Sequence, residues 1–257
     1  MQIIRFLLAL AVGLTLAMVP STSHAATAFT FDVGTANIKN NLTRSQIEND
    51  VNKVVGTSSV VGWQEMKTFD HNDVLDDLVG WDHVGLHSGR YQPISWDASK
   101  WTLINDGWET INSNQNRWLT WVVLERIGAA GDPGVGQRIR FVNTHFTSGM
   151  NWESTNPTQA ELDARAQWND CWNSMNNRID TWRSGGGYPI VGLGDYNKKR
   201  DDIALFDSAQ AHYSIYNKID HVFVIPKSRF ENKGEDTAAG PYYTDHGPYV
   251  AKVRFLG

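Results

Sequence analysis

Strand-like apolar runs alternate with helical stretches along most of this 257-residue chain. A helix N-cap pattern at Thr43 precedes apolar residues at helical spacing, and a long helical stretch runs from Pro157 to about Arg183. A shorter helix is predicted over residues 72–79. Strand patterns cover residues 28–38, 59–65, 81–86, 93–96, 101–105, 118–126, 137–147, 188–193, 221–225 and 248–255. Since consecutive strand pairs stand between helices, we expect two packed sheets covered by helices, in one domain over residues 26–257.

Composition excludes several classes of protein. A single cysteine, Cys171, rules out a disulfide framework and a cysteine-rich zinc site, and is expected to pack as a small apolar side chain. The net charge of −5 excludes a polybasic coat for nucleic acid. Most of the eleven tryptophans fall in predicted strands or helices, which favours a core role. Only Trp108 and Trp152 fall in predicted loops, where substrate contact stays open.

Residues 1–25 have the pattern of a secretory signal peptide. Arg5 precedes an apolar run that ends at Val19, and Ser23 and Ala25 provide a small-residue cleavage site. The run is shorter than the ~20 residues that a membrane span needs. We therefore expect cleavage after Ala25, export from the cell and a mature chain without a stable membrane span.

Polar side chains follow the predicted strands at the points where the strands end. Each alone is a weak signal, but together they are hard to explain structurally, since burying several carboxylates without a cation is costly. The set consists of Asn37, Glu65, His145, Asp195, Asn197, Asp220, Asp245 and His246.

These residue types suit metal-assisted phosphoester chemistry. Glu65, Asp245 and Asn37 offer the hard oxygen ligands that Mg²⁺ or Mn²⁺ prefers, whereas the histidines lack zinc-site spacing. Asp220 could fix the tautomer and charge of His246. Such a site is suited to the attack of water on a phosphate ester.

The order of these motifs resembles the endonuclease/exonuclease/phosphatase superfamily, which has the DNase I-like fold. The matching strings are spread from about residue 30 to 250, a range that spans nearly the whole mature chain: Asn37, Gln64-Glu65, Thr144-His145, Gly194-Asp195-Tyr196-Asn197, Ile219-Asp220 and Thr244-Asp245-His246. The resemblance implies a four-layered α/β sandwich, with two central and mostly antiparallel sheets flanked by helices. It places the site at one edge of the two sheets.

The resemblance also implies roles for the site residues. Glu65 would be the main metal ligand, assisted by Asn37 and Asp245. His145 would contact phosphate or act as general acid, and Asn197 would hold the phosphate. Asp195 would position or activate water, and Asp220 would pair with His246. Whether Asp195 or His246 takes the proton from water stays open. His221 is expected to be structural.

Three substrate classes are compatible with the sequence. A secreted nuclease or phosphodiesterase on nucleic acid ranks first, with Lys198 and the loosely matched Arg90 as possible substrate contacts. A lipid phosphodiesterase of the sphingomyelinase or phospholipase C kind ranks second, because Met150 and Trp152 could touch a membrane transiently. A phosphomonoesterase ranks third, since Lys199 stands where such relatives commonly carry arginine. A non-catalytic binding module would have lost some of the motifs. We expect a monomer.

Overall fold

The computed structural model describes residues 28–87, 89, 92–112, 116–199, 215–217, 219–236 and 240–257, which form two six-stranded sheets. The first sheet has the order β11-β12-β1-β2-β4-β3, with β1 (Phe29–Asn37), β2 (Val60–Gln64), β3 (Trp81–Val84), β4 (Ile94–Asp97), β11 (Phe230–Asp236) and β12 (Tyr249–Phe255). The second has the order β5-β6-β7-β8-β10-β9, with β5 (Trp101–Asn112), β6 (Arg117–Arg126), β7 (Arg138–His145), β8 (Ile190–Asp195), β9 (Ile215–Asn217) and β10 (Asp220–Ile225).

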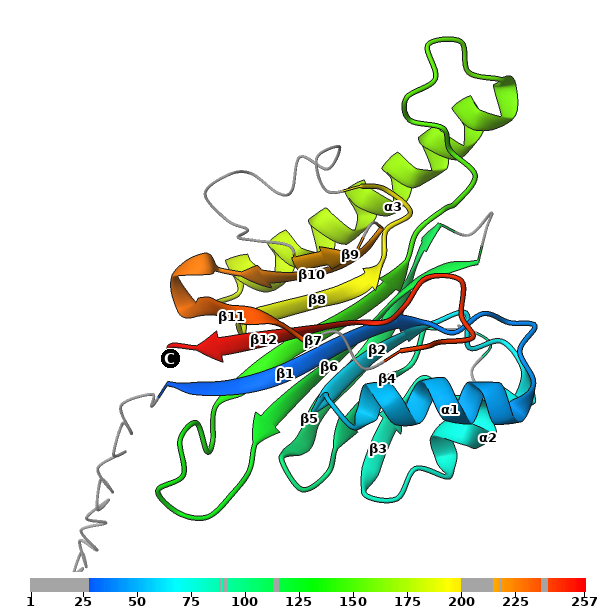
Figure 1. Ribbon diagram of the computed structural model, residues 1–257. Helices are drawn as coiled ribbons and strands as arrows, with labels where there is room; N and C mark the ends of the chain where they lie inside the picture. Colours follow the sequence, from blue (N-terminus) through cyan, green and yellow to red (C-terminus); the bar gives the residue numbers. More distant parts are fainter. Residues whose placement is uncertain are drawn as a thin grey trace, which may run out of the picture.

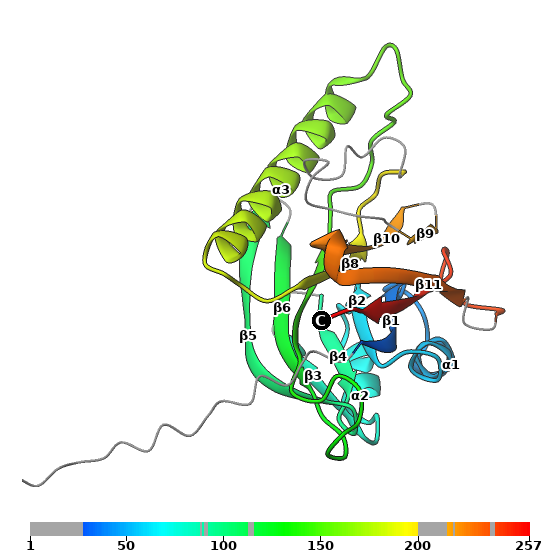
Figure 2. The ribbon, with the colours of Figure 1, turned by 90° about the vertical axis from the view of Figure 1, so that its left-hand side faces the viewer.

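The helices lie on the outer faces of the sheets and complete four layers. Helices α1 (Arg44–Val55) and α2 (Phe69–Asp76) cover the first sheet, and α3 (Gln159–Ser184) covers the second (Figures 1 and 2). A short 3₁₀ helix, Lys227–Arg229, joins β10 to β11. Each sheet has one parallel pair among antiparallel neighbours. This confirms the four-layered α/β sandwich that the sequence predicted.

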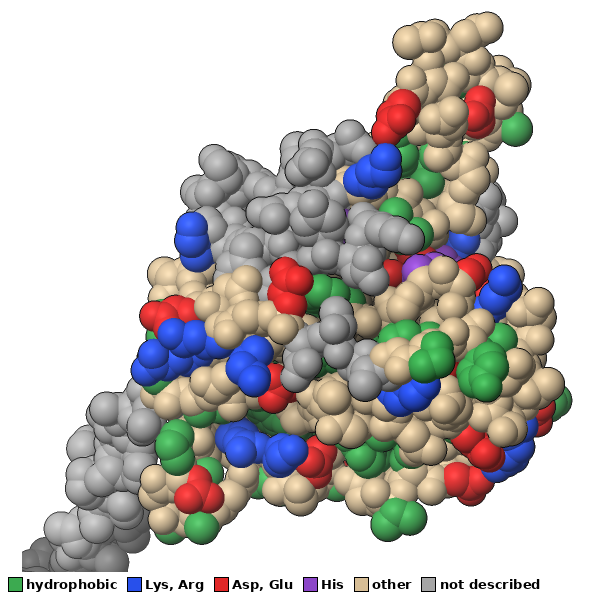
Figure 3. Space-filling model, viewed as in Figure 1, with side chains coloured by type: hydrophobic (Ala, Val, Ile, Leu, Met, Phe, Trp, Pro, Cys, Tyr) green, Lys and Arg blue, Asp and Glu red, His purple; other side chains and the backbone are tan. Residues whose placement is uncertain are grey.

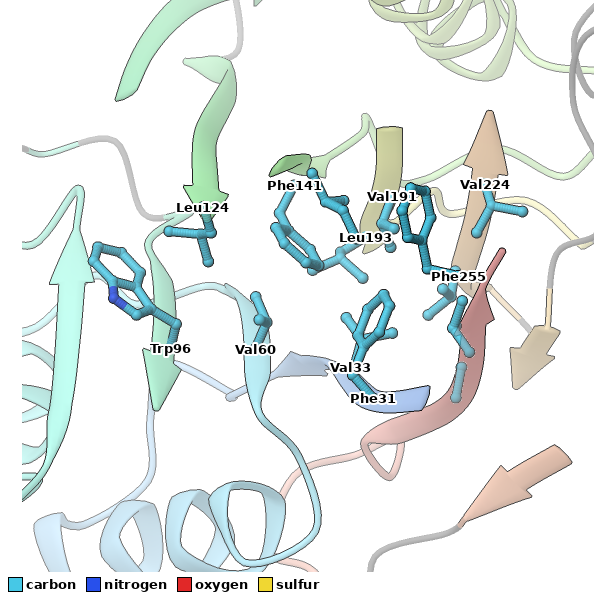
Figure 4. Packing of buried hydrophobic residues seen from close by; sticks show 14 of the residues in the cluster. Phe31, Val33, Val60, Trp96, Leu124, Phe141, Val191, Leu193, Val224 and Phe255 are labelled. Carbon is cyan, nitrogen blue, oxygen red and sulfur yellow. The ribbon is translucent and has the colours of Figure 1, made fainter. Parts of the chain in front are cut away.

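Apolar side chains fill the space between each pair of layers. Between the sheets, Phe31 of β1, Trp101 of β5 and Phe141 of β7 meet edge to face, with ring centroids 5.5–5.9 Å apart. Figure 4 shows Phe31 and Phe141 among the other apolar side chains of this layer. Burying each such ring stabilises the fold by roughly 1.5–3 kcal/mol. A second cluster joins α3 to its sheet and includes the buried thiol of Cys171, as expected for a packing role. A third cluster joins α1 and α2 to the first sheet.

Two parallel crossovers determine where the functional side chains meet. Helix α1 connects the parallel pair β1 and β2, and α3 connects the parallel pair β7 and β8. Parallel strands present their carboxyl ends at the same edge of a sheet. A hydrogen bond between Asn37, at the end of β1, and Asp195, at the end of β8, shows that the two sheets share this edge.

Several element boundaries differ from the predictions. Helix α2 covers 69–76 rather than 72–79, because Thr68 accepts a hydrogen bond from the N–H of His71 and caps the helix earlier. Strand β5 continues to Asn112, although Asn105-Asp106-Gly107 has the composition of a turn; a register shift after Leu103 accommodates these residues. The prediction of a loop around Trp108 was therefore wrong. The edge strands β9 and β11 were not predicted. In β11 the polar sequence hides the strand, since an edge strand needs little apolar surface.

Some predictions concern other parts of the chain. The expected signal peptide, residues 1–25, and Arg90 lie outside the described residues. Within the described residues, no helix has the length and apolar character needed to cross a membrane.

Candidate active site

Three side chains at the shared edge form a cluster that we call the buried triad: Asp195, Asp220 and His246. Asp195 ends β8 and Asp220 begins β10, and the two face each other in the antiparallel register. His246 lies in the loop before β12, with its Nδ1 2.6 Å from Oδ2 of Asp220 and its Nε2 3.7 Å from Oδ2 of Asp195. The exposed fractions of the three side chains are 2%, 1% and 16%. The sequence-predicted pairing of Asp220 with His246 is present in this geometry.

Two asparagines fix the Asp195 carboxylate. The Asn37 side-chain amide donates to Oδ2 of Asp195 at 2.9 Å, and the backbone N–H of Asn197 donates to Oδ1 at 2.8 Å. Asn197 adopts a positive φ of 51°, which asparagine tolerates better than most residues, and its side chain donates to the carbonyl of Phe146. Asp195 is therefore held from both sheets, with each carboxylate oxygen engaged.

His145 lies on the other side of Asp195. Its Nε2 is 3.5 Å from Oδ2 of Asp195, and its side chain is 5% exposed. Burial lowers the pKa of His145 well below its ordinary value, and the positive charges of Arg117, Lys67 and His246 act in the same direction. His145 is therefore neutral at physiological pH and can accept or donate one hydrogen bond at each ring nitrogen.

The pKa values of all three residues of the buried triad are raised above their ordinary values. Burial, followed by the charge of Asp220, raises the pKa of Asp195, although the charge of His246 and the Asn37 hydrogen bond act against this. Burial also raises the pKa of Asp220. Burial by itself lowers the pKa of His246, but its hydrogen bond to Asp220 and the charges of the triad acids raise it to about 9. At neutral pH His246 is therefore an imidazolium whose Nδ1 bonds to Asp220, while Asp195, with its raised pKa, lies on the Nε2 side.

Three further oxygen-bearing side chains lie at this edge, and we call them the open flank because two of them are carboxylates that reach water: Asn37, Glu65 and Asp245. Asn37 pairs with Gln64 in the β1–β2 register, so Glu65 follows directly beside it. Glu65 is half-buried and has a φ of 61°, a left-handed conformation that costs about 1–2 kcal/mol in a non-glycine residue. The Asp245 side chain is 55% exposed, with Oδ2 3.5 Å from Nζ of Lys39.

The open flank fits a hard divalent cation. Oδ1 of Asn37 is buried and accepts no hydrogen bond from the described residues. Because buried acceptors are normally paired, this oxygen is available to a hydrogen-bond donor or a cation. Carboxylate and amide oxygens with access to water are what Mg²⁺ or Mn²⁺ prefers. The ligand atoms of the buried triad also lie within 4.8 Å of one another. However, Nδ1 of His246 is engaged by Asp220 at 2.6 Å and the two triad carboxylates are almost fully buried, whereas Mg²⁺ usually keeps several of its waters. The open flank is therefore the better cation site.

Buried polar contacts below the edge hold these residues in place, and sequence analysis missed them. Asp50 of α1 is fully buried and accepts the backbone N–H groups of Tyr243 and Thr244 at 2.9 and 3.0 Å. This anchors the loop that carries Asp245 and His246. The available signal was an acid on the apolar face of an amphipathic helix.

A second buried contact joins the two sheets. The Gln64 side chain donates to Oδ1 of Asn143 at 2.6 Å, and the Asn143 amide donates to the carbonyl of Trp63 at 2.7 Å. A Cβ atom on Gly62 would lie 2.8 Å from the Asn143 side chain, so glycine permits this close approach. The ends of β2 and β7 are thereby fixed relative to each other.

Two further cations border the site. Arg117, at the start of β6, is half-buried; burial lowers its pKa, while the charges of Asp195 and Glu65 act in the opposite direction. Lys67 follows Glu65 by two residues and is exposed. Nothing in the local sequence marks Arg117, because it is the pairing of β6 with β7 that brings it near His145.

Two other residues considered in the sequence, Lys198 and His221, make contacts outside the buried triad and the open flank. The Nζ atom of Lys198 lies 3.8 Å from the ring centroid of Trp152 and 4.6 Å from that of Trp168, beside the Asn197 turn. His221 is buried, and its Nε2 is 2.8 Å from the Lys198 carbonyl, as a structural role requires. Figure 3 shows histidine side chains with acidic neighbours at this edge, at the foot of the protruding segment that leads into α3.

No protein-family profile matches the chain, and no curated protein matches it significantly. Solved structures, however, superpose on the chain over most of its length. An endonuclease/exonuclease/phosphatase family protein from Bacteroides thetaiotaomicron superposes with a TM-score of 0.67 at 16% identity, covering 90% of this chain and 96% of that one. A mannosyl-6-phosphatase from the same species gives 0.64 at 15% identity, covering 87% and 99%. TDP2 from D. rerio, complexed with a single-stranded DNA product, gives 0.64 at 11% identity, covering 87% and 98%. The chain therefore has the endonuclease/exonuclease/phosphatase fold, as the sequence resemblance implied.

Proposed function

We propose that this protein is an exported, metal-dependent phosphodiesterase that cleaves nucleic acid. The observation that carries the proposal is the Asp195 carboxylate, which is buried, held by amides from both sheets and placed between two histidines. This arrangement lies beside an open set of oxygen ligands. The fold shared with a phosphatase and with a DNA-bound TDP2 supports the same class of reaction.

The protonation states suggest how the residues divide the work. His246, charged at neutral pH, donates a hydrogen bond to a phosphate oxygen and stabilises the charge that develops there. Asp195, with its raised pKa, takes the proton from the attacking water; a base works best when its pKa is near the working pH. Neutral His145 and the Asn197 amide position the phosphate. Arg117 and Lys67 add positive charge around it.

Glu65, Asn37 and Asp245 would hold the cation. Once bound, Mg²⁺ or Mn²⁺ polarises a phosphoryl oxygen and screens its negative charge. Without a cation, the carboxylates of Glu65 and Asp245 would bring negative potential to a site that must accept an anion.

Hollows on both sides of the edge favour a diester over a monoester. One hollow of about 200 Å³ lies beyond Glu65 and is lined by Lys67, Phe69 and His87 among others. Another of about 230 Å³ lies beyond Asn197 and includes Trp152. A phosphodiester carries a substituent on each side of the scissile phosphate and can use both. Met150 and Trp152 pack partly buried against the α3 cluster, which leaves little apolar surface there for a membrane.

Export is proposed from the sequence alone. The basic start, the apolar run and the small-residue cleavage site of residues 1–25 support it. Fractionation of expressing cells, with N-terminal sequencing of the exported form, would test it. Full-length protein retained inside the cell would contradict export.

A substrate panel with the purified protein tests the proposed activity. It contains single-stranded DNA, plasmid DNA, RNA, sphingomyelin, phosphatidylcholine, inositol phosphates and mannose 6-phosphate, each with Mg²⁺, Mn²⁺ or EDTA. We expect metal-dependent cleavage of a nucleic acid, lost in Asp195→Asn and kept in the matched surface variant Asp180→Asn. Turnover confined to lipids or monoesters would contradict the nuclease assignment.

A further inference from the structure

A segment that protrudes from the sandwich forms one wall of the hollow beside Asn197. We call this segment, residues 147–158 between β7 and α3, the arm (Figure 1). The arm begins directly after His145 and Phe146, and the facing wall is the turn that follows Asp195. The two walls of the hollow therefore follow β7 and β8, the strands that end in His145 and Asp195.

The arm is tied to that turn by specific contacts. Glu153 of the arm forms an ion pair of 3.0 Å with Lys199, and the Asn197 side chain bonds to the Phe146 carbonyl. The Trp152 ring packs edge to face on Trp168 of α3, with centroids 5.4 Å apart. These contacts connect the arm to the turn after Asp195 and to α3, so the two walls of the hollow are joined.

The lining combines aromatic, amide and cationic groups. Trp152 and Met150 offer apolar and polarisable surface, Asn151 and Asn197 offer amides, and Lys198 places its ammonium 3.8 Å from the Trp152 ring centroid. An aromatic ring beside a cation is the combination that proteins use to bind single-stranded nucleic acid, in which bases contact rings and phosphates contact lysines. At about 230 Å³, the hollow has room for one ring-bearing group rather than for a drug-sized ligand.

We propose that this hollow is a nucleoside subsite. It takes the base and sugar of the nucleotide joined to the scissile phosphate on the Asn197 side. The base takes the place over the Trp152 ring that the Lys198 ammonium now occupies, and Lys198 turns to the adjoining phosphate. This inference deepens the proposed function and rests on it. A free sugar phosphate fits less well, because Glu153, the carboxylate among the described lining residues, is paired with Lys199, so a sugar hydroxyl would have to compete with that ion pair.

Selectivity between a large and a small diester tests the subsite. The measurement is the ratio of kcat/KM for a short oligothymidylate to that for methyl p-nitrophenyl phosphate, which has no nucleoside. Loss of one base–aromatic contact corresponds to a fall of about 5- to 150-fold. We expect Trp152→Ala to lower the ratio by such a factor. The control Trp108→Ala, which removes a 45% exposed tryptophan on β5, should stay within twofold of wild type. Equal ratios for wild type and Trp152→Ala would overturn the proposal, as would a selective loss of mannose 6-phosphate turnover.

A binding experiment separates the subsite from the proposed chemistry. Fluorescence anisotropy with labelled oligothymidylate in EDTA measures affinity without cleavage. Lys198→Gln should reduce the slope of log affinity against log salt concentration by about 0.7, whereas the surface control Lys227→Gln should leave it unchanged. This variant also keeps the test valid if Trp152→Ala folds poorly, which its melting temperature would reveal. If no phosphoester is cleaved, the proposed function fails, while weaker binding by both variants would still support the subsite. Unchanged binding in both would overturn it.

Discussion

The two sides of the shared edge differ in their access to water. In the buried triad the side chains of Asp195 and Asp220 are 2% and 1% exposed, whereas on the open flank the Asp245 side chain is 55% exposed. Both sides are rich in carboxylates. On the buried side, low polarity couples the acids to His246 and fixes where protons reside. On the open side, the carboxylates keep the water access that a hydrated cation requires.

The difference shows how one acidic edge can separate two tasks. In the proposed function the buried triad handles protons and the open flank would hold the metal, with Asn37 shared between them through its two polar atoms. The nitrogen of Asn37 bonds to Asp195, and its oxygen accepts nothing from the described residues. Each substitution below changes a residue of this edge or its support, and the measurements show which of the two sides is affected.

The largest effect is expected from Asp195→Asn. The substitution keeps the shape but removes the proton acceptor, so kcat for a diester should fall by about 10³-fold, within the 10²–10⁴ that a positioned base contributes. Metal binding and the far-ultraviolet circular dichroism spectrum should be retained. Near wild-type turnover would show that the base lies elsewhere.

Glu65→Gln should weaken metal binding at the open flank. We expect a fall of about 10²-fold in turnover at low metal concentration, with partial recovery as Mn²⁺ is raised, because the amide is a poorer ligand than the carboxylate. Metal titrations of activity measure this directly. A loss that no concentration of metal restores would assign Glu65 to the chemical step instead.

Asp50→Ala should disturb both sides of the edge, because Asp50 anchors the loop that carries Asp245 and His246. Removing the acceptor leaves the N–H groups of Tyr243 and Thr244 without their partner, which costs about 1–3 kcal/mol of the free energy of unfolding. Turnover should fall by about tenfold. Asp50→Asn, which keeps an acceptor oxygen, should recover part of both losses in urea unfolding and kinetics; equal loss in the two variants would argue against the anchoring role.

The last prediction concerns the pH dependence of stability. The folded-state pKa of His246 is raised from 6.5 to about 9, so its ion pair with Asp220 contributes fully below pH 6.5 and this contribution is lost as pH rises through about 9. The full contribution corresponds to about 3 kcal/mol. In EDTA, the difference in unfolding free energy between wild type and His246→Gln should therefore shrink from pH 6 to pH 10. A difference that grows with pH would contradict the charged state of His246.

Sequence patterns identified the strand ends but not what surrounds them. Asn37, His145 and Asp195 were identifiable because polar residues break apolar runs, and parallel crossovers bring such ends together. The anchoring role of Asp50 was hidden, because its partners lie more than 190 residues away in the chain. Strand β5 was cut short because Gly107, which reads as a turn, instead makes room for the Trp121 ring. Proton positions depend on burial, which no local pattern encodes.

Mn²⁺ binding tests the division between the two sides most directly. Electron paramagnetic resonance can count the ions bound to the wild type, Glu65→Gln and Asp220→Asn at equal metal concentration. The division predicts that the wild type binds Mn²⁺, that Glu65→Gln binds it at least tenfold more weakly, and that Asp220→Asn keeps its affinity within about threefold. Binding that survives in Glu65→Gln and is lost in Asp220→Asn would place the metal in the buried triad and contradict the account.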